Sequence, residues 1–139
     1  VFLTVGAVTA CSGSSDRHVE PPTKASVRAS SSTASLKAVD RGQTLFKKCR
    51  TCHTLKQDGR HKVGPNLYGI MDAPAGKKEG FNYSKAMMKT DVIWTETNLD
   101  AYLERPSKFM PGTQMAFVGI RKPEDRKLLI EYLKKETAP

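Results

Sequence analysis

Two cysteines and a histidine stand together in the segment Cys49-Arg50-Thr51-Cys52-His53. Two thiols three positions apart at a helix end can reach the two vinyl groups on one edge of a porphyrin and form thioether bonds. The next residue is then held under the iron, where its imidazole can ligate the metal. This C-x-x-C-H pattern is typical of c-type haem attachment. We therefore expect one covalently bound haem c, attached at Cys49 and Cys52 and ligated by His53.

Two other sites use a C-x-x-C pair. A thioredoxin-type redox pair needs a βαβ context, and the sequence shows none. A structural zinc site needs two further ligands at suitable spacing. Only Cys11, His18 and His61 remain, and no second pair exists. His18 lies in a Ser-rich stretch and is expected to be solvated, so neither alternative is favoured.

The periodicity of the apolar residues predicts an all-α domain. Helices are expected over about 39–51, over about 95–105 with Thr95 as N-cap and Pro106 as the stop, and from Pro123 to about residue 135. Shorter helical turns are expected around 65–70 and 84–89. No segment shows sustained alternation of period two. The expected architecture is thus three main helices, short helical turns and long loops wrapped around one haem.

An electron carrier fills the second axial position of the iron, whereas a haem enzyme leaves it open. Thioether sulfur suits haem iron and raises its potential relative to a second imidazole. The chain has five methionines, and a methionine at helical spacing more often fills a core. Met115 ranks first as the distal ligand because it follows Pro111-Gly112 in a loop between two helices. Met110 ranks second.

Several motifs together resemble class I cytochrome c, and in particular its mitochondrial-like bacterial branch. The resemblance spans about residues 39–136. The motifs are G-x-x-x-F-K-K-C-x-x-C-H at 42–53, H-T-L-K at 53–56, G-x-H-K-V-G-P-N-L-Y-G at 59–69, G-F-x-Y-S at 80–84, I-W-T at 93–95, L-x-x-Y-L at 99–103 and P-G-T-x-M-x-F at 111–117. The resemblance implies the cytochrome c fold and the transfer of single electrons.

The resemblance also implies roles for residues around the haem. The carbonyl of Pro65 would accept a hydrogen bond from His53. Tyr83 and Trp94 would hydrogen-bond a haem propionate. Tyr102 would approach the distal ligand Met115, and Thr113 would brace the far side of the haem.

The resemblance further implies that Gly42 and Phe46 pack against Leu129 and Tyr132, where the terminal helices cross, and that His61 bonds within its own loop. Two departures from the family pattern stand out. Ala73 replaces a common arginine near a propionate, with Lys77 or Lys78 nearby. Met87 replaces an asparagine on the distal side.

The chain is basic, with a formal net charge of +9. Such a surface speeds encounters with acidic partners, although charge alone is also compatible with nucleic acid or anionic lipid. No nucleic-acid-binding motif is present. The hypothesis is a basic ring near the haem edge that docks on acidic patches. Its members are Lys47, Lys48, Lys62, Lys108 and Lys122.

The chain divides by composition into three parts. Residues 1–11 form an apolar signal or anchor segment that ends in Val8-Thr9-Ala10-Cys11 and resembles a lipobox, with Cys11 as the lipid-bearing residue. Ordinary cleavage after Ala10 and an uncleaved signal anchor are the alternatives. Residues 12–37 read as a flexible Ser-rich linker, and 38–139 as the haem domain. Lipidation, ordinary cleavage and a signal anchor would each place the domain outside the cytoplasm. A tether would hold it on the periplasmic side of a bacterial membrane.

These features predict a monomeric electron carrier rather than an enzyme. By resemblance, it would move electrons between respiratory or photosynthetic membrane complexes, for example from a cytochrome bc1 complex to a terminal oxidase. The alternatives are a haem peroxidase or gas-binding protein with an open sixth position, and a basic nucleic-acid or membrane-surface module without haem.

Overall fold

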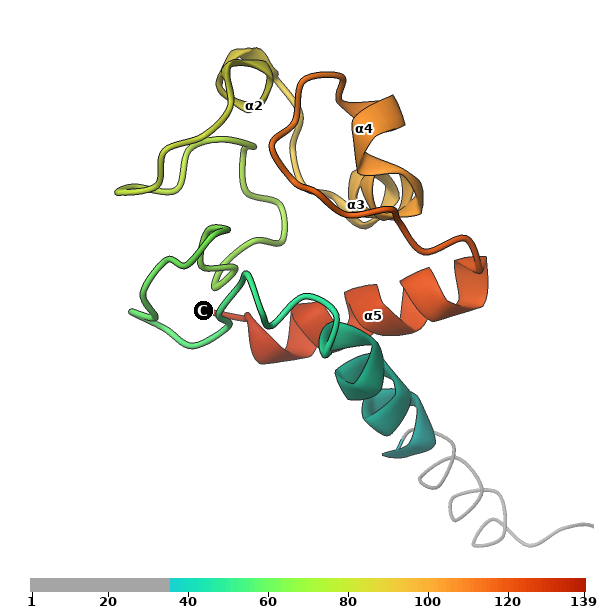
Figure 1. Ribbon diagram of the computed structural model, residues 1–139. Helices are drawn as coiled ribbons and strands as arrows, with labels where there is room; N and C mark the ends of the chain where they lie inside the picture. The colour runs from blue at the N-terminus through green and yellow to red at the C-terminus, as the bar shows by residue number, and fades with distance from the viewer. Residues whose placement is uncertain (1–35) are drawn as a thin grey trace, which may run out of the picture.

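The computed structural model describes residues 36–139, and this part of the chain is all-α, as predicted (Figure 1). Its helices are an N-terminal helix seen over 36–46, α2 (Lys85–Lys89), α3 (Glu96–Glu104), α4 (Pro106–Phe109) and α5 (Pro123–Glu136). The only strand-like pairing in this range is one antiparallel bridge between Pro74 and Ile93. Long loops make up the rest.

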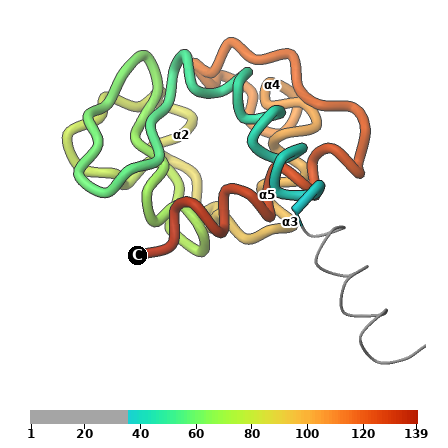
Figure 2. The backbone as a smooth tube through the Cα atoms, turned by 90° about the horizontal axis from the view of Figure 1, so that it is seen from below, coloured from blue at the N-terminus to red at the C-terminus, as the bar shows by residue number. Residues whose placement is uncertain are grey.

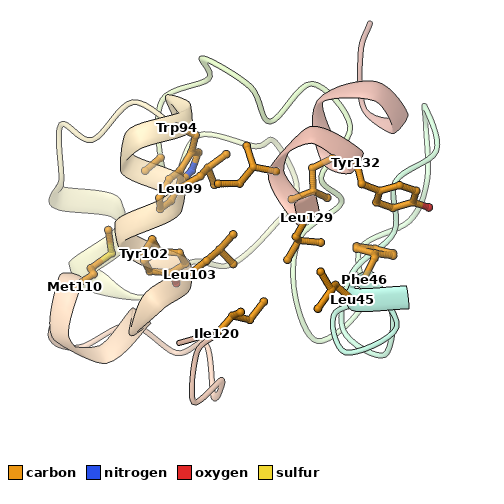
Figure 3. Packing of buried hydrophobic residues seen from close by; sticks show 13 residues of the cluster. Leu45, Phe46, Trp94, Leu99, Tyr102, Leu103, Met110, Ile120, Leu129 and Tyr132 are labelled. Atoms are coloured by element: carbon orange, nitrogen blue, oxygen red, sulfur yellow. The ribbon is translucent and has the colours of Figure 1, made fainter. Parts of the chain in front are cut away.

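The N-terminal helix crosses α5 at a glycine. A Cβ on Gly42 would meet Cβ of Tyr132 and the carbonyl of Leu128, so only glycine allows the two backbones this close. One turn later the Phe46 ring lies 5.8 Å from that of Tyr132, between centroids. Leu129 is fully buried beneath them (Figure 3). The predicted packing of the two terminal helices is therefore present.

The N-terminal helix differs from its predicted range at both ends. The chain is already helical at residue 36, three positions before the predicted start. The regular helix stops at residue 46 rather than 51. There the backbone hydrogen bonds tighten to a three-residue spacing, for example from the N–H of Cys49 to the carbonyl of Phe46 at 2.8 Å. The residues that follow form successive turns, which bring the attachment motif out of the helix.

α3 begins and ends close to the predicted positions. The Thr95 side chain accepts a hydrogen bond from the N–H of Asn98 at 3.2 Å, which caps the helix. Pro106 ends α3 and also begins α4, because its fixed φ suits the first position of a helix. That short second helix was not predicted from the sequence.

One of the two short helical turns is present and the other is not. α2 forms over Lys85–Lys89, close to the predicted 84–89, and the Ser84 side chain caps it. Residues 65–70 form no helix. Pro65 lacks an N–H, the Asn66 side chain accepts from the N–H of Tyr68, and Gly69 has a φ of +68°. These three features favour turns over helix.

The hydrophobic core joins the two halves of the described chain. Figure 3 shows Leu45 and Phe46 beside Leu129 and Tyr132 on one side, and Trp94, Leu99, Tyr102 and Leu103 of the α3 region on the other. In Figure 2 the loops of residues 54–84 lie on one side of the N-terminal helix, and the segment after α4 lies on the other.

No helix within residues 36–139 is long and apolar enough to cross a membrane. The proposed signal or anchor segment at 1–11, with Cys11, lies outside the described residues. So does the linker at 12–37 except for its last two positions, Leu36 and Lys37, which are helical.

Candidate functional site

The C-x-x-C-H motif lies in the turns that follow the N-terminal helix. The N–H groups of Cys52 and His53 both donate to the carbonyl of Cys49, at 3.0 and 2.9 Å. Both thiols are free and partly buried. Because this single turn carries all three groups, the two sulfurs and the imidazole are presented together. The local backbone is therefore suited to the attachment of one cofactor.

Pro65 fixes the orientation of the His53 ring. The distance from Nδ1 of His53 to the carbonyl oxygen of Pro65 is 2.7 Å. A carbonyl can only accept, so Nδ1 must carry the proton and Nε2 holds the free lone pair. This tautomer is the one that can ligate a metal through Nε2. The bond implied by the family resemblance is present.

Gly64 packs directly against the His53 ring. A Cβ at this position would overlap three ring atoms of His53. The N–H of Gly64 also donates to the carbonyl of Cys52 at 2.8 Å, which ties this loop to the attachment turn. The sequence analysis assigned no role to Gly64. The one sign of such a role in the sequence was the position of this glycine immediately before Pro65. The packing itself depends on the turn that carries His53, eleven residues earlier.

Burial adjusts the protonation of the site. It is the main cause of the lowered pKa of His53; the bond to Pro65 opposes the shift, and the nearby Lys62 adds to it. The imidazole is therefore neutral at pH 7 and available as a ligand. Burial also raises the pKa of the Cys49 thiol to about 11, although Lys48 opposes the shift. This thiol is protonated at neutral pH.

A second histidine, His61, holds the loop that contains Pro65 through both of its ring nitrogens. Nδ1 of His61 accepts from the N–H of Asn66 at 3.0 Å, so Nε2 donates to the carbonyl of Glu79 at 2.8 Å. The buried Asn66 amide in turn donates to Thr54 Oγ1 and the Lys56 carbonyl. Both ring nitrogens of His61 are thus used within the protein, which agrees with the expectation that it is not a metal ligand. Asn66 is a structural residue that the sequence analysis missed.

The two candidate distal methionines lie in different environments. Met110 is only 5% exposed and belongs to the hydrophobic core. Met115 is partly buried and lies in the loop between α4 and α5, where it packs against the edge of the core. A core residue cannot leave its place to bind a metal without opening a cavity. The geometry therefore favours Met115 over Met110 as the ligand.

Tyr102 of α3 reaches Met115 through Thr113. The hydroxyl groups of Tyr102 and Thr113 share a hydrogen bond of 2.9 Å, and Thr113 Oγ1 accepts from the N–H of Met115 at 3.3 Å. The Tyr102 ring also lies 4.9 Å from that of the buried Trp94, between centroids. These three side chains, which the sequence analysis named separately, form one connected group.

The structure brings together only some of the residues that were expected near a haem propionate. Tyr83 is half-buried, its ring packs edge-on against Phe81 at 4.8 Å, and burial raises its pKa, so it remains a neutral phenol. The ammonium of Lys78 is engaged within the protein, because it donates to the carbonyl of Tyr68 at 2.6 Å. Met87, which was expected on the distal side, lies against the core and packs beside Gly76.

The proposed docking lysines are all exposed, but the ammonium group of one of them forms a hydrogen bond within the protein. The ammonium of Lys62 donates to the carbonyl of Arg50 at 2.6 Å, within the attachment motif. This lysine therefore also holds the turn that carries the two thiols. The five exposed residues are Lys47, Lys48, Lys62, Lys108 and Lys122.

The residues present fit a covalently attached haem. Two thiols, an imidazole with its Nε2 lone pair free and a loop methionine provide the attachment and ligand groups. The described residues also include large apolar side chains that pack against the core yet are only partly buried, as expected for a surface that covers a flat apolar group. They are Leu55, Leu67, Ile70, Met71, Met87, Phe109, Met115 and Phe117.

Comparison with known proteins gives a consistent result. Residues 39–136 match the Cytochrome c family. A cytochrome c of Kluyveromyces lactis is 46% identical over 96 residues, covering 68% of this chain and 87% of that protein. One of Chlamydomonas reinhardtii is 48% identical over 99 residues, covering 70% and 88%. One of Trypanosoma brucei brucei is 56% identical over 77 residues, covering 55% and 83%.

These relatives are eukaryotic, and the family match spans residues 39–136, most of the expected haem domain. The match covers the helices, the attachment motif and the distal loop described above. The chain therefore belongs to the cytochrome c family: it is an electron-transfer protein and not an enzyme, and its cofactor is one covalently bound haem c.

Proposed function

We propose that this protein carries single electrons between membrane complexes, with haem c held by Cys49, Cys52, His53 and Met115. The observation that carries this assignment is the 2.7 Å contact between Nδ1 of His53 and the Pro65 carbonyl, which leaves Nε2 for the metal beside the two thiols. When bound, the haem supplies an iron that alternates between ferrous and ferric states. The protein residues hold it, exclude water and keep the ligands in place.

The distal assignment rests on the loop. Thr113 and Tyr102 hold the backbone of Met115, while Met110 is buried in the core. With His53 and Met115 both holding the haem iron, the protein would leave no place on it for a substrate. His53 and Met115 would hold the haem in the same way whether it is oxidised or reduced, so that little rearrangement of the protein would accompany the transfer of an electron.

An absorption spectrum of the purified protein, oxidised and reduced, tests the proposal. The protein must be made in a host that can attach haem c. A low-spin spectrum with the weak red band of methionine sulfur on ferric iron is expected. A high-spin spectrum with ready CO binding would instead support an open sixth position, as in a haem peroxidase or gas-binding protein. A colourless protein would contradict the proposal and leave the basic-module alternative.

The partners we propose are acidic surfaces of redox complexes, such as a cytochrome bc1 complex as donor and a terminal oxidase as acceptor. The support is the net charge of +9 and the exposure of the five docking lysines. Charge steering gives fast, weak and salt-sensitive association. The rate of electron transfer to an oxidase should therefore fall as ionic strength rises. A rate that does not change with salt would remove the steering proposal.

We further propose that the N-terminus tethers the haem domain to the periplasmic face of a bacterial membrane. The support comes from the sequence alone, because an apolar stretch ends at Cys11 and a Ser-rich stretch follows it. Mass spectrometry of the mature N-terminus should find a lipid on Cys11. An unmodified, membrane-bound chain would favour the signal anchor, and a soluble chain would contradict the tether. The haem domain itself is expected to be monomeric.

A further inference from the structure

Arg126 is a buried cation at the start of α5. Its side chain is 8% exposed, and its Nε and Nη2 donate to the two carboxylate oxygens of Asp100 in α3, at 2.7 and 3.0 Å. The bond to Asp100 is the main cause of a raised pKa, so the guanidinium stays charged. A two-pronged pair of this kind fixes geometry as well as charge. Arg126 is therefore held firmly between two helices.

The remaining donors of Arg126 point to the chain that leads away from Met115. Nη1 donates to the carbonyls of Ile120 and Arg121, both at 3.0 Å. The N–H of Ile120 donates in turn to the carbonyl of Leu103 at 2.8 Å. In Figure 1 this segment passes from α4 across α3 and into α5. Its last residues are thus fastened to α3 on one side and to Arg126 on the other.

Gly119 completes this attachment. It has a φ of +96°, and a Cβ there would overlap the carbonyl of Glu104 at the end of α3. The backbone therefore lies directly on α3. At the other end of the loop, Thr113 is bonded to Tyr102. Between these two points, over residues 114–118, the hydrogen bonds that the structure shows stay within the loop.

We propose that Arg126 is a positioning residue for the distal haem ligand, because it fixes the end of the loop from which Met115 reaches the iron. The inference rests on the proposed ligation by Met115. Tyr102 fixes the first anchor of the loop and Arg126 fixes the second. Loosening the second anchor lets the loop move away, so that Met115 is detached from the iron a larger fraction of the time.

A purely structural role for Arg126, as a brace between α3 and α5, makes a different prediction. A second ion pair joins the same two helices: Lys134 donates to Glu96 at 2.6 Å, with both side chains more than half exposed. This pair does not touch the loop. Its removal therefore tests the effect of losing a bridge between α3 and α5 without losing the loop anchor.

The experiment uses the full haem-loaded protein and the variants Arg126→Lys, Asp100→Asn and Lys134→Gln. Arg126→Lys keeps the charge but cannot reach all four acceptors, since an ammonium lacks the planar fork. Asp100→Asn keeps the shape of the pair and weakens it. The first readout is the affinity of ferric haem for added imidazole, which competes with Met115. The second is the hydrogen-exchange rate of the Ile120 amide, and the third is the reduction potential.

Arg126→Lys should bind imidazole about tenfold more tightly than the wild type, because affinity rises with the fraction of time that the sixth position is open. Its Ile120 amide should exchange faster, and its potential should fall. Asp100→Asn should show a smaller change in the same direction, and Lys134→Gln none.

Unchanged imidazole affinity in both Arg126→Lys and Asp100→Asn would overturn the inference, even if their unfolding midpoints fall. An equal gain in affinity in Lys134→Gln would also overturn it, because the effect would then come from the helix contact. If Arg126→Lys does not fold, Asp100→Asn decides by the same criteria. A wild-type protein without the methionine red band would show instead that the ligation by Met115 is wrong.

Discussion

The two sides of the haem site are held in different ways. On the proximal side, His53 and the residues that fix it, Gly64 and Pro65, lie within twelve positions along the chain. On the distal side, Thr113 accepts from the N–H of Met115 and Phe117 donates to its carbonyl. The loop itself is anchored by Tyr102 of α3 and Arg126 of α5. The proximal ligand is held by its own loop. The distal ligand depends on helices from elsewhere in the fold.

Because of this difference, we expect the two proposed ligands to detach from the iron in a fixed order. In the proposed ligation, the turn that carries the two attachment cysteines keeps His53 beside the metal as long as the covalent bonds last. Met115 has no covalent link and relies on long-range packing. Any disturbance of α3, α4 or α5 should therefore release Met115 first and leave His53 bound.

Loss of the two attachment thiols has the largest expected effect on this comparison. In Cys49→Ala/Cys52→Ala no thioether can form, so we expect a complete loss of covalent haem, measured by haem staining of a denaturing gel. Cys11→Ser is the matched control and should keep its haem, because Cys11 lies outside the haem domain. Haem retained covalently by the double variant would place the attachment elsewhere.

Replacing each loop methionine separates ligation from packing. Met110→Ala should keep the red band but lower the free energy of unfolding by about 2–5 kcal/mol, because it leaves a cavity in the core. Met115→Ala should lose the band with a much smaller loss of stability. Absorption spectra and denaturant unfolding measure both effects. The opposite pattern would make Met110 the ligand.

A methyl group added at Gly64 tests the proximal side alone. It would push the His53 ring out of place, and Gly64→Ala should cost about 1–3 kcal/mol in stability, as overpacking does. The neighbouring Val63 is 84% exposed, so Val63→Ala serves as a control with little effect. Denaturant unfolding measures both variants. If Gly64→Ala is as stable as the wild type, the glycine does not hold the ring.

Removal of a single hydroxyl tests the first anchor of the distal loop. Tyr102→Phe loses the bond to Thr113 and should lose about 0.5–1.5 kcal/mol of stability. Its imidazole affinity should rise, because Thr113 holds the N–H of Met115. Tyr132→Phe is the control, because no hydrogen bond to its hydroxyl is seen within residues 36–139. Equal imidazole affinity in the two variants would show that Tyr102 does not position the loop.

The features predicted correctly from the sequence are mostly local. Thr95 caps α3 and Pro123 begins α5, because each acts on residues within one turn. The attachment motif is equally local. Met115 ranked above Met110 because Pro111-Gly112 marks a loop, and the difference in burial agrees with that ranking.

The features that the sequence analysis missed depend on contacts between distant segments. Asp100, Ile120 and Arg126 meet only after α3 and α5 have packed, and their spacing in the sequence carries no sign of it. The early end of the N-terminal helix was missed because periodicity continues through the turns that follow it. The predicted helical turn at 65–70 was wrong because Asn66 and Gly69 favour local turns.

The crossing of the N-terminal helix with α5 has a consequence for biosynthesis. Arg41 of the N-terminal helix forms an ion pair with Asp125 of α5, 84 positions later, at 2.9 Å. Gly42 packs against Tyr132, which also lies in α5. Closing so long a loop is slow and requires the end of the chain. A chain whose last helix has not yet packed lacks this crossing, so we expect its two attachment thiols to be more accessible to haem than they are in the finished fold.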